Sequence, residues 1–338
     1  EKKAAKYILE NIRASYGNTA GLVARAASFA EDSGLELTLK NFLDYYHLDP
    51  RAIYKFSSFS RICARADAIE DFSEPLEDIL TKAFAKLAVI DSRRWISFLL
   101  DILPRLDNAD FATLSDVKKR MMQMFYITVW GKAVEDWSSE EALDNLYALS
   151  DSTVLLNELM ELLRYRFEQI DFIDEPVDLG FDCPLDLHCT YTRDQILVAL
   201  DFMKPSTVRE GVKWLPEKNI DVFFVTLNKA DKDYSPTTMY NDYSINESLF
   251  HWQSQSTTAE NSPTGQRYIH HKERGSKVLL FVREFKADRV TGGAEAYTYL
   301  GTVNYVKHEG SRPMNITWRL DRPIPAKFLK KTNKLVVG

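Results

Sequence analysis

The apolar positions of the first 170 residues recur at spacings of three and four, which is the period of an amphipathic helix. Three helices stand out in this pattern. One follows the N-cap candidate Ser73, one runs from Ser115 to a stop at Gly131, and one begins near Asp151 or Ser152. Glycine is scarce in this half of the chain. The pattern predicts roughly seven to ten helices in a bundle or irregular array.

Beyond residue 184 the pattern changes to alternation of apolar and polar positions, which is typical of strands. An acidic stretch at 170–184, with two prolines and a glycine, separates the two patterns and marks a boundary. One helix is expected at 193–202, with Thr192 as its N-cap. The runs with the strongest strand character lie at 221–227, 277–285, 297–306 and 314–320.

Together these patterns predict an α+β protein of two domains. Residues 1–180 would form an all-α helical array. Residues 181–338, with many short strands and one helix, would form a mainly antiparallel β-barrel. Because the first residue is Glu1 rather than Met, we read the chain as a fragment of a longer protein.

Charge also divides the chain between these two parts. Residues 1–180 carry 21 Lys and Arg side chains against 31 Asp and Glu, whereas residues 181–338 carry 22 against 18. From residue 264 to the end the count is 15 against 6, although the whole chain has a net charge of −6. A polyanionic partner would therefore bind the second part; the alternative is a surface that is merely lopsided in charge.

Nothing in the sequence indicates a membrane protein or a secreted one. No stretch approaches the ~20 uncharged apolar residues that a membrane span needs, and no charged, apolar and small-residue leader opens the chain. The three cysteines, Cys63, Cys183 and Cys189, cannot build a disulfide framework, and their odd number fits a reducing compartment. We therefore expect a cytoplasmic protein with no membrane partner.

Motifs for catalysis or metal binding are missing or incomplete. No glycine-rich phosphate loop is present. Cys183 and Cys189 flank His188, as zinc ligands do, but a second ligand pair is lacking. His270 and Lys272 form an H-x-K triplet like that of phospholipase D-type nucleases, but the acidic residue expected downstream is absent. We therefore expect no catalytic residue, metal ion or cofactor here; an intrinsic nuclease that uses His270 and Lys272 stays as an alternative.

One segment, residues 234–258, combines large aromatic rings with amides and a carboxylate. Aromatic faces stack on bases, whereas amides and carboxylates bind base edges, so this mixture favours a nucleobase as ligand. The alternative is that Phe250 and Trp252 are core residues on one strand face, with Gln253 and Gln255 bonded to backbone. The candidate pocket residues are Tyr240, Asp242, Tyr243, Phe250, Trp252, Gln253 and Ser254.

A basic stretch follows this segment and supplies candidate contacts to a DNA backbone. Cationic side chains bind phosphates without reading the sequence, so this stretch would position the duplex while the pocket reads the base. Its residues, which we call the basic loop, are Arg267, His270, His271, Lys272, Arg274 and Lys277.

Several motifs of the second half also occur together in a fixed order. They resemble the C-terminal domain of bacterial modification-dependent (type IV) restriction endonucleases, which begin with a phospholipase D-type nuclease and continue with a DEAD-type helicase. The helical half, including residues 37–54, resembles the spacer between the helicase and that domain. The motifs are YTRDQIL (191–197), FVTLNK (224–229), YSPTTMYNDYSI (234–245), FHWQSQ (250–255), LLFVREF (279–285) and RPMNITWRL (312–320).

The resemblance implies a target-recognition domain with an SRA/PUA-like fold at 181–338, after a helical spacer at 1–180. Such a domain would bind duplex DNA that carries 5-methylcytosine or 5-hydroxymethylcytosine and would flip the modified base. The resemblance also implies nuclease and helicase domains upstream in the same polypeptide. ATP and magnesium would serve those domains, and this fragment would be non-catalytic. The sequence leaves a homodimer open.

In such a pocket the flipped cytosine would stack between aromatic rings, for which the candidates are Tyr240, Tyr243 and Trp252. Asp242 would accept a hydrogen bond from the exocyclic amine, and Gln253 or Ser254 would bind another edge atom. The rival interpretation is a protein-interaction or dimerisation module of a helicase–nuclease that reads no modified base.

Overall fold

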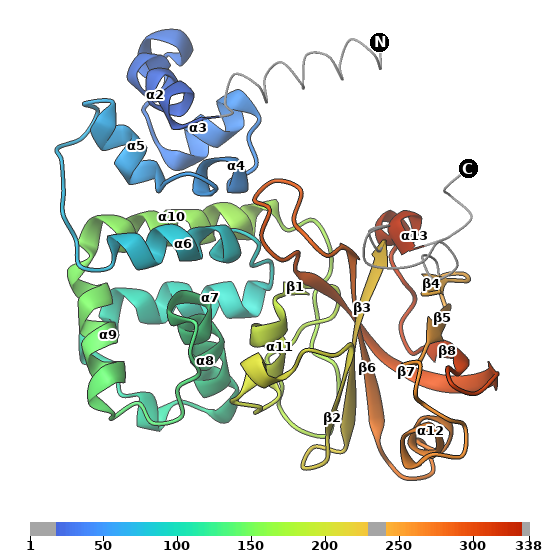
Figure 1. Cartoon of the computed structure of the whole chain (residues 1–338). Coiled ribbons are helices and arrows are strands. Elements are labelled where there is room, and N and C mark those ends of the chain that lie inside the picture. The colour runs from blue at the N-terminus through green and yellow to red at the C-terminus, as the bar shows by residue number, and fades with distance from the viewer. Residues whose placement is uncertain (1–17, 229–240, 333–338) are drawn as a thin grey trace, which may run out of the picture. The chain divides into compact units, whose positions relative to one another are not determined.

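The computed structural model describes residues 18–228 and 241–332. The chain forms two compact units, which we call the helical unit and the sheet unit (Figure 1). The helical unit comprises Glu1–Asp171 and Arg289–Thr291, and the sheet unit comprises Phe172–Asp288 and Gly292–Gly338. No helix in the described part of the chain is long and apolar enough to cross a membrane.

Polar side chains start most helices of the helical unit by accepting a hydrogen bond from a first-turn backbone N–H. These N-cap side chains are Asn18, Thr38, Ser58, Ser92 and Ser139. The elements are α2 (Thr19–Ser33), α3 (Leu39–Tyr46), α4 (Arg51–Tyr54), α5 (Phe59–Arg65), α6 (Glu77–Leu87), α7 (Arg93–Ile102), η1 (Leu103–Asn108), η2 (Phe111–Thr113), α8 (Asp116–Trp130), α9 (Glu140–Asp151) and α10 (Thr153–Gln169).

The helices predicted after Ser115 and Ser152 are confirmed as α8 and α10. The third differs, because α6 begins at Glu77 instead of directly after Ser73. The reason lies in Glu74, whose carboxylate accepts hydrogen bonds of 2.8 and 2.9 Å from two backbone N–H groups in the first turn of α10. Glu74 therefore caps α10, and α6 begins only after it.

The sheet unit contains one mixed sheet with the strand order β2-β3-β6-β7-β8-β5-β4, while β1 pairs with β7. All pairings between these strands are antiparallel except that of β3 with β6. The elements are β1 (Thr190–Tyr191), α11 (Arg193–Ala199), η3 (Pro205–Thr207), β2 (Val212–Leu215), β3 (Ile220–Asn228), β4 (Tyr243–Ser244), β5 (Leu249–Gln253), α12 (Pro263–Ile269), β6 (Lys277–Phe285), β7 (Tyr297–Glu309), β8 (Asn315–Leu320) and α13 (Ala326–Thr332).

The sheet is not closed into a barrel, so the predicted barrel needs correction. The strand order ends at β2 on one side and at β4 on the other. The strands next to the two ends, β3 and β5, are in contact through side chains and not through backbone hydrogen bonds: Trp252 of β5 stacks on Phe223 of β3, with ring centroids 4.1 Å apart. β2 and β4 have only four and two residues, which is too short to extend a ladder across this aromatic contact.

Both faces of the central strands are buried, which explains why their sequences are nearly continuous apolar runs. Phe223 faces an aromatic core that includes Trp252 and Trp318. The opposite face carries Phe224 and Tyr297, whose rings lie 5.3 Å apart. Because side chains alternate along a strand, Thr226 of β3 and Arg283 of β6, which pair across the parallel ladder, share this second face.

Candidate functional site

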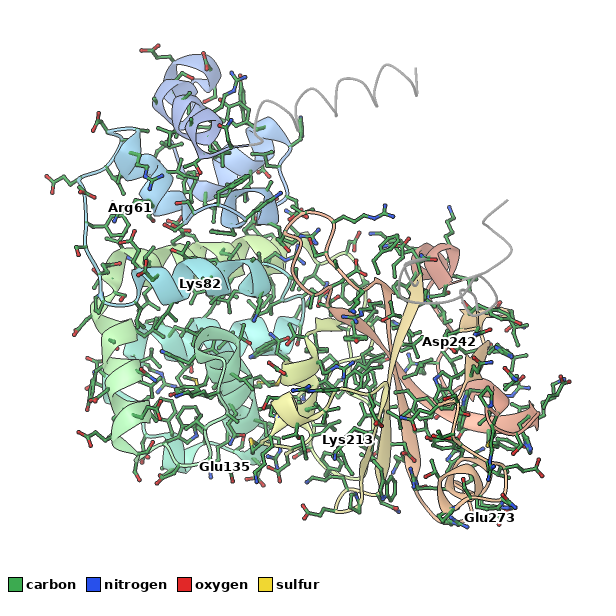
Figure 2. All side chains as sticks on the ribbon, in the orientation of Figure 1. Arg61, Lys82, Glu135, Lys213, Asp242 and Glu273 are labelled. Carbon is green, nitrogen blue, oxygen red and sulfur yellow. The ribbon has the colours of Figure 1, made fainter. Side chains whose placement is uncertain are left out.

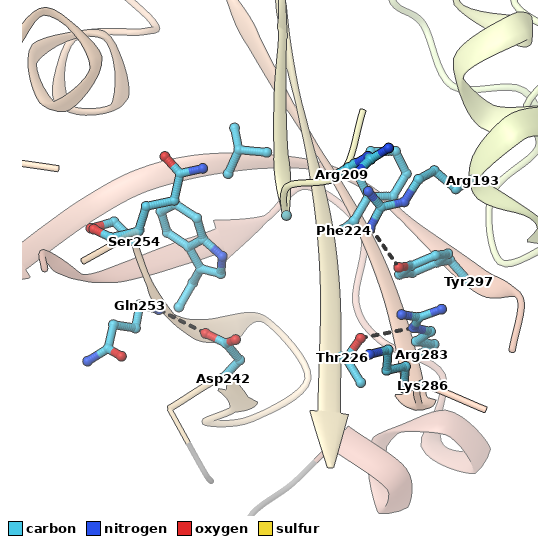
Figure 3. Close-up of a pocket in the computed structure, with 14 residues that line it drawn as sticks. Arg193, Arg209, Phe224, Thr226, Asp242, Gln253, Ser254, Arg283, Lys286 and Tyr297 are labelled. Carbon is cyan, nitrogen blue, oxygen red and sulfur yellow. Dashed lines mark hydrogen bonds between the residues drawn. The ribbon is translucent and has the colours of Figure 1, made fainter. Parts of the chain in front are cut away.

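A pocket of about 470 Å³ lies in the sheet unit where the sheet stays open (Figure 3). Residues from both ends of the strand order line it, because β2 and β3 contribute one side and β5 the other. This volume is typical of small-molecule sites in proteins. The lining residues are Arg193, Arg209, Gly211, Val212, Phe224, Thr226, Asp242, Trp252, Gln253, Ser254, Gln255, Arg283, Lys286 and Tyr297.

Four of the lining residues, Arg193, Arg209, Arg283 and Lys286, are cationic, and we call them the cationic wall. The half-buried Arg193, in the first turn of α11, donates to two backbone carbonyls at 2.9 and 3.3 Å and to the Tyr297 hydroxyl at 3.3 Å. Its guanidinium also lies over the Phe224 ring at 4.6 Å. These contacts fix the guanidinium in one orientation.

Arg283 is held just as firmly on the other side of Tyr297. Its Nε donates to Thr226 Oγ1 at 2.9 Å and one terminal nitrogen donates to the Glu295 carbonyl at 3.2 Å. Its guanidinium lies 4.5 Å from the centre of the Tyr297 ring. Burial lowers the pKa of Arg283 from its usual value, and the charge of Arg193 lowers it further.

The opposite side of the pocket carries Asp242, Gln253, Ser254 and Gln255, which we call the polar wall (Figure 3). Asp242 Oδ1 accepts a 2.8 Å hydrogen bond from the Gln253 backbone N–H, which orients the carboxylate. The Ser254 hydroxyl is engaged with backbone, since it donates to the Gln255 carbonyl and accepts from the backbone N–H of Met314. Asp242 is the anionic residue among those that line the pocket.

The structure brings four of the predicted pocket residues together: Asp242, Trp252, Gln253 and Ser254 all line this cavity. Trp252 also belongs to the core, because it is only 4 % exposed and packs on aromatic rings. Both roles meet in one side chain, with its ring in the core and part of its surface at the pocket.

The remaining predicted pocket residues lie elsewhere. Tyr240 falls outside the described residues. Phe250 lies on the same face of β5 as Trp252, but it is fully buried in the core and does not line the pocket. Tyr243 stacks on His251 with ring centroids 4.8 Å apart and does not line the pocket either.

Two members of the basic loop have structural roles instead of open cationic ends. Arg267 binds the buried carboxylate of Asp221 through two hydrogen bonds of 2.8 and 2.9 Å, and its guanidinium lies over Trp214. His271 is 2 % exposed, and its Nε2 accepts from the backbone N–H of Tyr305. Neither side chain is placed to bind a phosphate.

The other members of the basic loop are more accessible. Lys272 and Arg274 are exposed, and His270 is half-buried near Glu273. Lys277 donates to the backbone carbonyl of Leu179. This part of the sheet unit lies apart from the pocket, as the positions of Glu273 and Asp242 in Figure 2 show. The basic loop and the pocket share no lining residue.

Sequence reasoning missed the cationic wall and its two supporting rings, Phe224 and Tyr297. One signal was available: Arg283 is a charged residue within the apolar run LLFVREF, where a buried strand should carry none. Nothing comparable marks Arg193 or Arg209, because both lie in ordinary polar surroundings in the sequence.

The cysteine–histidine cluster has no metal-site geometry. Cys183 and Cys189 are buried and form no disulfide, and His188, which is half-buried, has a positive φ of 69°. Burial lowers the pKa of the His188 imidazole. Among the residues that the structure describes, no group of three or more His, Cys, Asp or Glu side chains is arranged to hold a metal ion.

Comparison with known proteins shows that part of the sheet unit is similar to a protein family, but it does not indicate a function. The search of curated proteins gave no match to this sequence. A protein-family model described as "Domain of unknown function (DUF3427)" matches residues 185–331, a range that includes every residue lining the pocket. Residues 185–331 of the sheet unit are therefore similar to this uncharacterised family.

Proposed function

We propose that the sheet unit binds DNA that contains 5-methylcytosine or 5-hydroxymethylcytosine and accepts the flipped base in the pocket. One observation supports this best: the pocket places an oriented carboxylate, Asp242, opposite a wall of four cationic side chains. A nucleotide needs both kinds of group, because its base edge carries an amine donor and its backbone carries negative charge.

The contacts in the polar wall narrow the roles suggested by sequence. Asp242 is the natural acceptor for the exocyclic amine of cytosine, because its carboxylate faces the cavity and is fixed by the Gln253 N–H. Ser254 serves backbone groups instead. Trp252 contributes the surface it exposes to the pocket.

Unpairing a base costs a few kcal/mol, so contacts to the flipped nucleotide and to the surrounding phosphates must offset this cost. The added methyl group contributes roughly 10–200-fold in a well-packed pocket. In this proposal the chain is a non-catalytic specificity module, with nuclease and helicase domains upstream that use ATP and magnesium. The SRA-like character of the domain and its role in restriction are part of the same proposal.

The test is a gel-shift series with the 338-residue chain and three duplexes that differ only in one central cytosine. The duplexes carry cytosine, 5-methylcytosine or 5-hydroxymethylcytosine. We expect the modified duplexes to bind more tightly by a factor within roughly 10–200. Equal binding of all three duplexes, or no binding, would favour the rival interpretation, a protein-interaction or dimerisation module.

The most informative variant is Asp242→Asn. Its amide oxygen can still accept the hydrogen bond from the Gln253 N–H, but the negatively charged oxygen proposed to accept a hydrogen bond from the cytosine amine is lost. It should abolish the preference for modified duplex and leave weak, salt-sensitive binding. The matched control is Glu273→Ala, which removes an exposed acidic side chain of the same unit outside the pocket. A folded Asp242→Asn protein that still prefers modified duplex as strongly as the parent would rule out this pocket assignment.

A further inference from the structure

The cationic wall contains more positive charge than the pocket itself neutralises. Of the residues that line the cavity, four are cationic and one, Asp242, is anionic. Arg209 and Lys286 are exposed, and their side chains make no hydrogen bond or ion pair with any residue the structure describes. Their cationic ends are therefore open to a ligand.

Arg193 and Arg283 are different, because each is already held by neutral groups. Carbonyl oxygens, the Thr226 hydroxyl and the Tyr297 hydroxyl accept their hydrogen bonds, and no carboxylate in the described part of the chain forms an ion pair with either guanidinium. Both guanidinium groups also rest on aromatic rings. Neutral acceptors orient a guanidinium without cancelling its charge.

Two arginines lie around one tyrosine in this partly buried wall. Burial lowers the pKa of Arg283 and the charge of Arg193 acts in the same direction, whereas Tyr297 and Glu295 act in the opposite direction. An anion in the cavity would relieve this repulsion, and planar guanidinium groups suit the oxygens of a phosphate. Because the groups are already oriented, little additional ordering is needed on binding.

We propose that the cationic wall is a preorganised subsite for the phosphate group of a nucleotide. This proposal deepens the proposed function, since it assigns one wall of the same pocket to phosphate and leaves the base edge to the polar wall. The phosphate belongs either to the strand that carries the flipped base or to a free nucleotide. The chemistry of recognition is the same for both sources.

The experiment compares ligands that differ only in phosphate, using the 338-residue chain. The probes are 5-methyldeoxycytidine, its 5′-monophosphate, inorganic phosphate as a competitor, and the methylated duplex. We expect the monophosphate to bind at least about tenfold more tightly than the nucleoside, because charge-assisted hydrogen bonds are stronger than neutral ones. Inorganic phosphate should compete with the monophosphate. If only the duplex binds measurably, the source is the DNA strand.

The variants are chosen so that folding does not obscure the result. Arg209→Ala combined with Lys286→Ala removes two exposed side chains and should weaken monophosphate or duplex binding at least about tenfold, without changing nucleoside binding. Arg283→Met tests the half-buried position, with a thermal melt beside it. The matched control is Arg319→Ala, an exposed arginine of β8 outside the pocket, which should change neither.

The outcomes separate this inference from the proposed function. The phosphate subsite is overturned if the double variant weakens neither monophosphate nor duplex binding, or if it weakens binding no more than Arg319→Ala does. A double variant that loses phosphate-dependent binding, in a chain that never distinguishes modified from plain duplex, supports the subsite and contradicts modified-base recognition. A chain that prefers modified duplex but is insensitive to the double variant supports modified-base recognition and overturns the subsite.

Discussion

The helical unit and the sheet unit each bury a carboxylate, but the groups that donate hydrogen bonds to this carboxylate differ between the units. In the helical unit, Glu158 accepts hydrogen bonds from the backbone N–H groups of Phe59 and Ser60, at 3.0 and 2.6 Å, at the start of α5. In the sheet unit, Asp221 is paired with Arg267 instead. A helix start offers several N–H groups at one point, whereas a strand uses its N–H groups in the ladder.

This difference extends to the cationic side chains. In the helical unit, Arg61 and Lys40 are paired with acidic side chains at the surface. In the sheet unit, Arg193 and Arg283 of the cationic wall line a cavity and are held by neutral oxygens. In these examples the cations of the helical unit pair with carboxylates, whereas the four cations of the cationic wall line a cavity. Variants in both units test this contrast, beginning with the one expected to cost the most stability.

Breaking the buried ion pair should have the strongest effect on stability. Asp221→Ala leaves Arg267 without its partner and should lower the free energy of unfolding by about 3–5 kcal/mol. Denaturant unfolding of the parent and the variant measures this change. The control is Glu141→Ala, which removes an exposed partner of Lys132 in the helical unit and should cost about 0–1 kcal/mol. Equal losses would contradict the contrast between the units.

Removing the buried carboxylate of the helical unit should have an intermediate effect. Glu158→Ala leaves the donors at the start of α5 unsatisfied and should cost about 1–3 kcal/mol. Glu158→Gln keeps an acceptor oxygen, so it should lose less. Denaturant unfolding ranks the three proteins, and a glutamine variant as unstable as the alanine variant would show that the charge, not the hydrogen bonds, matters most.

Acid should destabilise the sheet unit through His271. Burial lowers the pKa of this imidazole, so below about pH 6.5 the unfolded chain binds a proton that the folded chain does not. The free energy of unfolding should therefore fall as pH drops below that value, by less than about 1.4 kcal/mol per pH unit for this group. His271→Gln, measured by thermal melts from pH 5 to 8, should weaken this dependence. His270→Gln, at the less buried neighbour, should not.

Replacing the exposed cations of the basic loop should barely affect folding. Lys272→Ala with Arg274→Ala should change the free energy of unfolding by less than about 0.5 kcal/mol. Binding to modified and plain duplex should weaken by similar factors, and the salt dependence should flatten by roughly one slope unit per lost phosphate contact. The control replaces Lys82 and Lys86, exposed on α6 of the helical unit (Figure 2 labels Lys82). An unchanged salt slope would place the basic loop outside the DNA interface.

Local sequence patterns predicted several of the elements. The helix after Thr192 forms with a full capping box, because Gln195 stands three residues after the cap and both reciprocal hydrogen bonds are made. The strand at Lys277–Phe285 lies where the apolar run predicted it. Such signals are readable because they depend on residues within one or two turns of each other.

The sequence predicted one wall of the candidate site, the polar wall, but not the cationic wall. The residues of the polar wall are close together in the chain, so their mixed aromatic and amide character was visible in one segment. The cationic wall combines residues from α11, the segment before β2 and the C-terminal end of β6. Arg193 and Tyr297, which share a hydrogen bond, are 104 positions apart.

Hydrophobic period and capping act locally, so the amino-acid sequence alone indicated elements such as α8, α10, α11 and β6. It predicted a single helix in the second half, and this was wrong because α12 and α13 also form there. The open sheet, and the pocket at its open side, depend instead on tertiary contacts. The parallel pairing of β3 with β6 sets Thr226 beside Arg283. Strand order depends on contacts between residues far apart in the sequence, and the partner of each buried charged side chain depends on strand order. No local sequence pattern could therefore have predicted the strand order or these partners.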